Sequence, residues 1–300
     1  MSDELIRVDG LRFGYPGAEQ PTLHGLDFSV SGGDIYGFLG PSGAGKSTTQ
    51  KILYRLLEGY GGSVQLFGRE IRQWDTAVYE RMGIGFETPN LYGKLTGREN
   101  LQFALSMRRE TAVGASGIEQ AAERLGLGMA LDNRVETYSK GMRMRLAFIR
   151  AVLHAPQLLF LDEPTGGLDP LWARRVKDWI LELRQQGTAV FITTHSMELA
   201  DELCDSVGFL VDGRLMLQQN PAELKQEYGK PGVIVHGRTA DGAQCELELG
   251  YDRLLDGSLE REAAGAGISE VVRIQNREVS LEQVFLQVTG RSLHSGEVVS

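Results

Sequence analysis

Apolar and polar positions alternate in the N-terminal part of the chain. The apolar positions are Ile6, Val8, Leu11 and Phe13, followed by Leu26, Phe28 and Val30. A period of two places such side chains on one face of an extended backbone, as in an antiparallel sheet with one buried face. The pattern therefore predicts half-buried antiparallel strands at the start of the chain.

Three later runs are apolar at consecutive positions. Ile35–Leu39 leads into a glycine-rich loop and a helical pattern over residues 47–57, whereas Leu158–Leu161 and Val190–Ile192 are apolar on both faces. Runs of the latter kind are typical of parallel strands covered by helices on both faces. These runs predict an α/β core behind the antiparallel strands.

A helical pattern interrupts this core. It extends over residues 96–155 and begins with Thr96–Glu99, which has the form of a capping box. We therefore expect a helical insert at about residues 88–155. Further along, Asp212 and Gly213 lie between two apolar runs and predict a hairpin turn.

The pattern changes again near residue 226. Short alternating segments follow, and then an amphipathic helix with Ser280 as its cap, Gln283 three positions on, and Gly290 at its end. The apolar stripe of this helix consists of Leu281, Val284, Phe285 and Val288. We expect a main domain at residues 1–225 and a small α+β domain at residues 226–300.

Composition and charge limit the classes of function. The 300 residues carry a net charge of −9, which argues against nucleic acid as a partner. No apolar stretch approaches the roughly 20 residues of a membrane-spanning helix, and the N-terminus is acidic where a secretory signal is basic. Cys204 and Cys245 form neither a metal-binding spacing nor a disulfide framework. We expect a cytoplasmic protein that reaches a membrane only through a partner.

Gly40–Ser47 has the sequence GPSGAGKS and fits the P-loop pattern GxxxxGK[ST]. Glycines let backbone N–H groups turn toward phosphates, Lys46 reaches the β- and γ-phosphates, and Ser47 is a ligand for Mg²⁺. The predicted nucleotide-binding residues of this segment are Gly40, Ser42, Gly43, Ala44, Gly45, Lys46, Ser47 and Thr48. The alternative is a glycine-rich turn that binds nothing, but this segment follows a predicted strand and opens a predicted helix.

A pair of carboxylates ends the apolar run at residues 158–161. Because ligands of parallel sheets bind at the carboxyl ends of strands, Asp162 is placed to hold Mg²⁺ through water. Glu163 is placed to act as the general base toward the attacking water. Two acids that merely begin a turn before Pro164 are the alternative. With the P-loop, these residues predict a nucleotide-hydrolysing site whose catalytic groups include Lys46 and Glu163.

Three further motifs distinguish among the classes of P-loop protein that these residues still allow, such as kinases and GTPases. Tyr138–Met142 opens a helical pattern before Asp162, Gly166–Pro170 follows Glu163, and Thr193–His195 ends the next strand. This order of motifs resembles the ATP-binding-cassette (ABC) family over residues 4–225. The resemblance implies a P-loop NTPase core with an antiparallel β subdomain and a helical insert. A kinase or a GTPase would leave the segment at Tyr138–Met142 unexplained, and the Asn-Lys-x-Asp motif that reads guanine does not occur.

The resemblance also implies roles for single residues. Tyr15 would stack on the adenine ring of ATP. Ser139 and Gly141 would donate to the γ-phosphate held by a second copy of the chain, and Asp169 would help form the seam between the copies. His195 would contact the γ-phosphate and act as a catalytic residue beside the general base. The plainer alternatives are a packed aromatic for Tyr15, a helix cap for Ser139 and a structural histidine for His195.

The chain departs from the family pattern at two places. The usual LSGGQ has Tyr138, Lys140 and Met142 at its first, third and fifth positions, while the phosphate-binding serine and glycine remain. Glu87 stands where the family has a glutamine that ligates Mg²⁺, and a carboxylate there is an acceptor only. The predicted metal ligands are Ser47, Asp162 and Glu87.

Both departures resemble a bacterial exporter branch of the family, as does the C-terminal segment Ser280–Arg291. The branch implies an ATPase subunit on the inner face of the cell membrane, with a separate transmembrane permease, a second nucleotide-binding subunit, and a permease helix docked near Asn90–Thr96. The basic residues of the helical pattern that Tyr138–Met142 opens are expected to form a solvated face; they are Lys140, Arg143, Arg145 and Arg150. A non-transport ABC ATPase of DNA repair or translation is the alternative, although the chain has neither a long coiled coil nor a second cassette. The sequence does not identify the substance that the permease transports.

Overall fold

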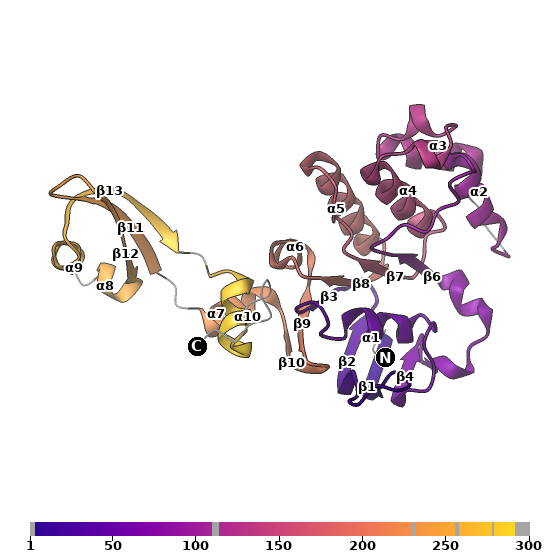
Figure 1. Ribbon diagram of the computed structural model, residues 1–300, viewed down its shortest axis with the longest axis horizontal. Helices are drawn as coiled ribbons and strands as arrows, with labels where there is room; N and C mark the ends of the chain where they lie inside the picture. The colour runs from indigo at the N-terminus through magenta and orange to yellow at the C-terminus, as the bar shows by residue number, and fades with distance from the viewer. Residues whose placement is uncertain (1–3, 110–113, 230–231, 256–257, 278, 292–300) are drawn as a thin grey trace. The chain divides into compact units, whose positions relative to one another are not determined.

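The computed structural model describes residues 4–109, 114–229, 232–255, 258–277 and 279–291 (Figure 1). These residues fall into two compact units, one ending at Asn220 and one beginning at Pro221. None of the described helices combines the length and the hydropathy that a membrane-spanning helix requires.

The N-terminal strands form the antiparallel sheet that the period-two pattern predicts. Its strand order is β2-β1-β4-β5, with all neighbours antiparallel. The strands are β1 (Glu4–Phe13), β2 (Leu23–Ser31), β4 (Gly61–Leu66) and β5 (Arg69–Glu70).

A second sheet of six strands confirms the predicted α/β core. Its order is β10-β9-β3-β8-β7-β6, and its neighbours are parallel except for the hairpin of β9 and β10. The strands are β3 (Ile35–Leu39), β6 (Met82–Gly85), β7 (Leu158–Asp162), β8 (Ala189–Thr194), β9 (Ser206–Val211) and β10 (Arg214–Gln219). The hairpin turns at Asp212 and Gly213, which both have a left-handed backbone.

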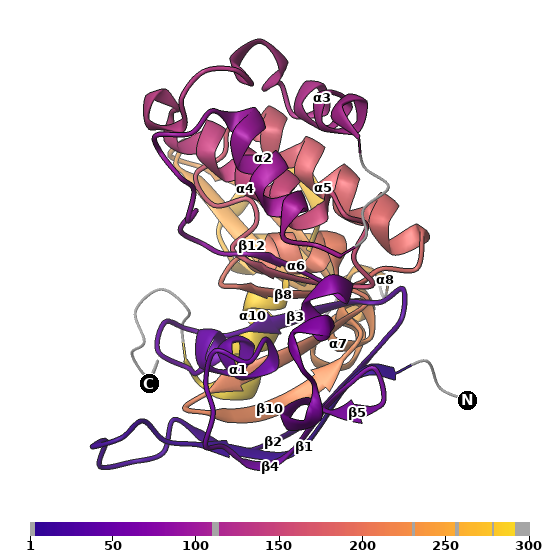
Figure 2. The same ribbon diagram turned by 90° about the vertical axis from the view of Figure 1, so that its right-hand side faces the viewer.

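Helices lie on the two sides of this sheet in the first unit. Figure 2 shows α2, α4 and α5 on one side of β3 and β8, and α1 with the antiparallel sheet on the other. The helices are α1 (Lys46–Leu53), α2 (Gly97–Ser106), α3 (Ala115–Arg124), α4 (Lys140–Val152), α5 (Pro170–Gln185) and α6 (Met197–Leu203). Short 3₁₀ turns occupy Ile71–Gln73, Thr76–Arg81, Gly128–Ala130 and Val135–Thr137.

The predicted helix starts are more accurate than the predicted ends. Thr96 forms the expected capping box with Glu99 at the start of α2. The helix expected to reach residue 57 ends at Leu53 instead. Arg55 has a left-handed backbone with φ of +60°, and its guanidinium binds the carbonyl of Asp75 at 3.1 Å. These backbone and side-chain constraints outweigh the continuing apolar pattern.

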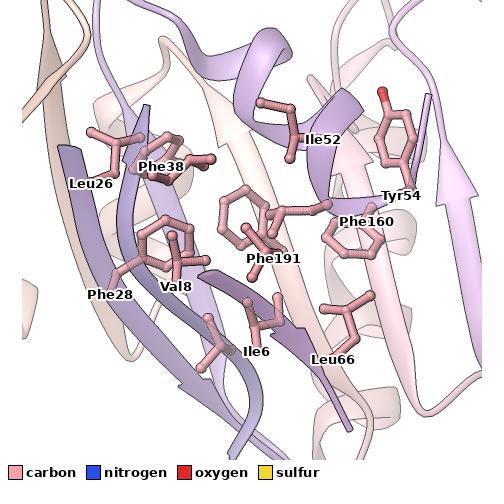
Figure 3. Packing of buried hydrophobic residues seen from close by; sticks show 14 of the residues in the cluster. Ile6, Val8, Leu26, Phe28, Phe38, Ile52, Tyr54, Leu66, Phe160 and Phe191 are labelled. Carbon is pink, nitrogen blue, oxygen red and sulfur yellow. The ribbon is translucent and has the colours of Figure 1, made fainter. Parts of the chain in front are cut away.

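The core of the first unit lies between the two sheets (Figure 3). Phe28 of the antiparallel sheet packs on Phe38 and Phe191 of the parallel sheet, with ring centroids 5.5 and 5.9 Å away. Burial of each such ring stabilises the fold by about 1.5–3 kcal/mol. The aromatic packing therefore fixes β3 and β8, the strands that lead into the glycine-rich loop and into His195.

The second unit contains a small antiparallel sheet of order β12-β11-β13. Its elements are α7 (Pro221–Tyr228), β11 (Gly232–Thr239), β12 (Gln244–Gly250), α8 (Tyr251–Leu255), α9 (Leu259–Gly265), β13 (Ile268–Arg277) and α10 (Leu281–Thr289). The capping box of Ser280 and Gln283 is confirmed at α10, whereas α7, α8 and α9 were not predicted. The domain boundary predicted between residues 225 and 226 falls inside α7 and stays a prediction.

Candidate nucleotide-binding and catalytic site

Four neighbouring parallel strands bring the predicted site residues to one edge of the sheet. The glycine-rich loop follows β3, His195 follows β8, Glu163 follows β7, and Glu87 lies just beyond β6. These strands are adjacent in the order β3-β8-β7-β6. Motifs far apart in the sequence therefore meet at the carboxyl ends of the strands, where open α/β sheets bind ligands.

The glycines of the loop are required by its backbone. Gly43 and Gly45 have φ of +81° and +107°, which side chains disfavour. A Cβ at Gly45 would lie 2.7 Å from Cδ2 of Leu23, and one at Gly40 would lie 2.1 Å from the carbonyl oxygen of Leu210. The loop thus packs closely on its surroundings at both ends, and it leads directly into the N-terminus of α1.

Lys46 folds back over this loop. Its Nζ donates to the carbonyl oxygens of Gly40 at 2.5 Å and Pro41 at 2.9 Å. Burial lowers the pKa of Lys46, and three nearby carboxylates oppose that shift. They belong to Glu163, Asp162 and Glu87. The ammonium is therefore a positive charge held between the loop and the acidic strand ends.

Asp162 is fixed at the end of β7. Its Oδ1 accepts a hydrogen bond of 2.5 Å from the hydroxyl of Thr193, on the neighbouring strand β8. Burial raises the pKa of Asp162, the hydrogen bond from Thr193 lowers it, and the charges of Glu87 and Glu163 raise it. The strand end itself is tied to α1, because Gln50 Nε2 donates to the carbonyl oxygen of Leu161 at 3.1 Å. A cation in this site would relieve the repulsion among the carboxylates.

Glu163 is held by three hydrogen bonds from the end of β8. Its Oε1 accepts from the backbone N–H of His195 at 2.8 Å and from the His195 ring at Nδ1, 2.6 Å away. Its Oε2 accepts from the hydroxyl of Thr194 at 2.8 Å. The backbone of Glu163 has φ of +48°, a conformation that costs a non-glycine residue about 1–3 kcal/mol. The Glu163 side chain is only 15% exposed, whereas that of His195 is 61% exposed.

A pocket of about 290 Å³ joins these groups. It is lined by Ser42, Gly43, Gly45, Lys46, Ser47, Thr48, Glu87, Asp162, Glu163 and His195. The lining combines the N-terminus of a helix and a lysine, which suit phosphates, with hydroxyl and carboxylate oxygens, which suit a hard cation. Within the described residues, no group of three or more His, Cys, Asp or Glu side chains is arranged to hold a metal ion alone.

Tyr15 lies beside this pocket. Its hydroxyl is 3.2 Å from Oγ1 of Thr48, one of the lining residues. The ring packs edge-on against Phe13, with centroids 5.0 Å apart, and stays 40% exposed. This position leaves exposed ring surface next to a residue that lines the pocket.

The remaining predicted residues are helix caps outside the pocket lining. Ser139 caps α4, where its Oγ accepts from the backbone N–H of Met142 at 3.2 Å. Asp169 caps α5 and accepts from the backbone N–H of Trp172 at 3.1 Å. Both caps are exposed, and Gly141 lies in the first turn of α4. Within one chain, therefore, the structure does not bring these residues to the P-loop.

The prediction of a solvated basic face on α4 is wrong for Arg145, which is only 7% exposed. Arg143 and Arg150 are half-buried and donate to the backbone carbonyls of Tyr138 and Asn90. The arginine side chains are long enough to reach carbonyl groups that the helical pattern does not reveal. Lys140 is exposed as predicted.

Sequence reasoning also missed the two threonines that hold the carboxylates. Thr193 and Thr194 are fully buried. The signal that was available is their position at the end of a strand next to the acidic one, directly before His195. Their contacts become visible only when the order of the strands is known.

Comparison with known proteins agrees with this geometry. The family model described as ABC transporter matches residues 23–166. A "Fluoroquinolones export ATP-binding protein" of Mycobacterium tuberculosis is 46% identical, over 97% of this chain and 95% of the relative. A "Daunorubicin/doxorubicin resistance ATP-binding protein" of Streptomyces peucetius is 38% identical, over 95% of this chain and 92% of the relative. A solved structure titled "Structure of ATP binding subunit of ABC transporter" has a TM-score of 0.67 at 28% identity, covering 75% of this chain and 93% of that chain.

The chain therefore belongs to the ABC transporter family, and it matches relatives named as ATP-binding proteins of drug export and drug resistance. It is an ATPase, and the alternative of a repair or translation ATPase is not favoured. The predicted fold, a P-loop NTPase core with an antiparallel β subdomain and a helical insert, is confirmed.

Proposed function

We propose that two copies of this chain bury ATP between them and, by hydrolysing it, drive a separate membrane permease. The observation that carries this proposal is the separation of the site within one chain. The P-loop and the catalytic carboxylates line one pocket, while Ser139 and Gly141 present a capped helix start elsewhere. A head-to-tail pair would bring that helix start, with its positive dipole, to the γ-phosphate in the partner's pocket.

Mg²⁺ would complete each pocket. Its ligands would be Ser47, Asp162 and Glu87, which line the same cavity and offer only oxygen donors. When bound, the ion would neutralise phosphate charge. The absence of a complete all-protein cage among the described residues agrees with Mg²⁺, which usually keeps waters and substrate phosphates as ligands.

Each side chain around the pocket would have its own role in ATP hydrolysis. Lys46 would exchange its bonds to loop carbonyls for the β- and γ-phosphates, and the ring of Tyr15 would stack on adenine. Glu163 would accept the proton of the attacking water as the bond from the γ-phosphorus to ADP breaks. His195, already bonded to Glu163 through Nδ1, would point Nε2 toward the departing phosphate. Asp169 would lie at the seam between the copies.

A groove beside the pocket would receive the permease. It has a volume of about 830 Å³, and its walls include Phe86, Tyr92 and Phe103. Arg108, Arg109 and Arg150 outnumber the one acidic residue of the lining, Glu80, and give the same groove a net positive charge. An amphipathic cytoplasmic helix of the permease, with an acidic side chain, would match these walls. Phe86 directly precedes Glu87 in the chain, which would link permease movement to the nucleotide.

The relatives support export of a small organic drug molecule as the transported cargo. One is named for fluoroquinolones and one for daunorubicin and doxorubicin. Cargo contacts would lie in the permease, which would hold this subunit at the inner face of the cell membrane.

The variant Glu163→Gln tests the proposed function. We expect MgATP binding to be retained, hydrolysis to fall at least about a hundredfold because the general base is lost, and an ATP-dependent dimer to accumulate. Phosphate release and sedimentation velocity measure these effects. The control is Glu202→Gln, an exposed carboxylate on α6 paired with Lys177, which should hydrolyse ATP normally. Normal turnover in Glu163→Gln would exclude this residue as the base.

A further inference from the structure

Arg145 is a buried cation that connects two segments that do not line the chain's own pocket. It lies in the second turn of α4, after the signature segment (Tyr138–Met142), and is only 7% exposed. Burial lowers the pKa of Arg145, and the charge of Asp169 raises it. A buried guanidinium without partners would be very costly, so its contacts define what it holds together.

Toward the signature segment, Arg145 binds backbone carbonyls. Its Nε donates to the carbonyl oxygen of Gly141 at 3.2 Å, and its Nη1 donates to that of Leu125, in the turn after α3. Gly141 is itself one of the groups expected to face the γ-phosphate. The planar fork of arginine reaches both carbonyls, which a single ammonium group cannot do in the same way.

Toward the D-loop (Gly166–Pro170), Arg145 stacks on a tryptophan. Its guanidinium carbon lies 4.2 Å from the centroid of the Trp172 ring, near the start of α5. The backbone N–H of Trp172 donates to the capping carboxylate of Asp169 at 3.1 Å. The ring system also packs closely on the turn after α3, since a Cβ at Gly126 would lie 2.0 Å from it.

A second contact joins the same two segments. The D-loop residue Gly167 has φ of +72°, and a Cβ there would lie 3.3 Å from Cε of Lys140. A Cβ at Gly141 would lie 3.8 Å from the carbonyl oxygen of Gly167. The signature segment and the D-loop therefore approach each other closely at these residues, and Arg145 is a second link between them.

We infer that Arg145 is a positioning residue that locks the signature segment to the D-loop, so that both meet the second copy as one rigid surface. This inference rests on the proposed function, because it assumes that Ser139, Gly141 and Asp169 act across the dimer. Arg145 does not line the nucleotide pocket of its own chain. Its effect is on dimer formation and on hydrolysis in the dimer, and the pocket of its own chain is left intact.

Arg145→Lys in the Glu163→Gln chain tests this inference. Lysine keeps the charge but loses the fork, so we expect the ATP-dependent dimer to weaken about tenfold, as for loss of one charge-assisted hydrogen bond. MgATP binding to the monomer should stay within about twofold, because the P-loop is untouched. Sedimentation velocity with MgATP measures the first quantity, and calorimetric titration below the dimerisation concentration measures the second.

Arg175→Lys is the matched control. Arg175 also approaches the Trp172 ring, at 5.8 Å, but it is exposed and its hydrogen bond goes to Arg124. This variant should dimerise like its parent. Trp172→Phe keeps a smaller aromatic ring under Arg145, so it should weaken the dimer less than Arg145→Lys does, and it serves as the test if Arg145→Lys does not fold.

Three outcomes decide between the explanations. An unchanged dimer in Arg145→Lys, or in Trp172→Phe where the former does not fold, overturns the inference. Loss of monomer MgATP binding in parallel with dimerisation overturns it as well, since that result shows general destabilisation. Failure of the Glu163→Gln parent to dimerise with MgATP overturns the proposed function instead, and the positioning role of Arg145 with it.

Discussion

At the residue scale, the site depends on how its carboxylates are held. Glu163 has a strained backbone. Its carboxylate accepts a hydrogen bond from the hydroxyl of Thr194 and two hydrogen bonds from His195. The same Thr194 hydroxyl accepts from the backbone N–H of Ser196 at 2.9 Å. One hydroxyl group thus connects the expected general base to the turn that begins α6, and it orients the carboxylate for the attacking water.

Thr194→Val removes this hydroxyl with almost no change in volume. We expect hydrolysis to fall by about tenfold to a hundredfold, because a hydrogen bond to a charged group is lost, while MgATP binding is retained. Steady-state phosphate release and nucleotide titration measure the two effects. Thr188→Val is the control, since Thr188 is buried at the other end of the strand and bonds the carbonyl of Pro156. Equal turnover in both variants would contradict the orienting role.

The sequence predicts best those residues that belong to a short motif with fixed spacing. The P-loop residues lie in one short segment, and that segment predicts its own loop and helix. Thr194 and Arg145 carry no such signal, because Glu163 and Leu125, the partners that define their roles, are 31 and 20 residues away in the chain. A threonine at a strand end and an arginine on a helix have many ordinary environments. Only the strand order and the packing of α4 select the environment found here.

At the scale of elements, local rules predict the chain better than non-local ones. Both predicted capping boxes are present, because a capping box involves only four neighbouring residues. Strand β6 was not predicted, since Gly83 and Gly85 hide its apolar pattern. Gly83 lets α4 pack against this strand: a Cβ there would lie 2.2 Å from the carbonyl oxygen of Ala151. The packing of α4 on this segment therefore explains why it forms a strand, which its local sequence does not indicate.

The contact between α4 and β6 also makes stability depend on pH. His154, just after α4, has Nε2 3.0 Å from the carbonyl oxygen of Met82. Burial, together with the charge of Arg108, lowers the pKa of His154 from 6.5 to about 4. His154 is therefore protonated below about pH 6.5 in the unfolded chain but only below about pH 4 in the folded chain. The stabilisation is complete above pH 6.5 and is lost as the pH falls toward 4.

The variant His154→Gln should remove this dependence. Between pH 6.5 and 5, we expect the unfolding free energy of the natural chain to fall more steeply than that of the variant, by up to about 1.4 kcal/mol per pH unit. Urea unfolding followed by tryptophan fluorescence measures it, because Trp74, Trp172 and Trp179 all lie in the first unit. Identical slopes for both proteins would show that the pKa of His154 is the same in the folded and the unfolded chain.

At the scale of the whole molecule, the proposed function requires two surfaces beyond the nucleotide pocket. One meets the second copy through Ser139 and Asp169, and the other meets the permease through the groove at Tyr92 and Phe103. The sequence predicted both surfaces by family resemblance. It did not predict the groove's arginine lining, because the partners of these side chains are distant in the chain: Arg108 donates to the carbonyl of Tyr79 and Arg150 to that of Asn90. The two surfaces should be separable by mutation.

Phe103→Ser tests this separation at the groove. Phe103 is 43% exposed and packs edge-on against Tyr92, with centroids 5.1 Å apart. We expect co-purification with the permease to fall at least about tenfold, because an aromatic anchor in a groove is a typical binding hot spot. The ATP-dependent dimer of the same variant, made in the Glu163→Gln chain, should form normally, since the groove and the helix caps use different residues.

Met129→Ser separates a groove effect from a general loss of exposed apolar surface. Met129 is fully exposed in the same helical insert, yet it does not line the groove. If the groove is the docking site, this variant keeps the permease that Phe103→Ser loses. If both variants lose it equally, the helical insert as a whole is being disturbed. If neither loses it, the permease binds elsewhere, and the link from the groove through Phe86 to Glu87 is then without a function in coupling.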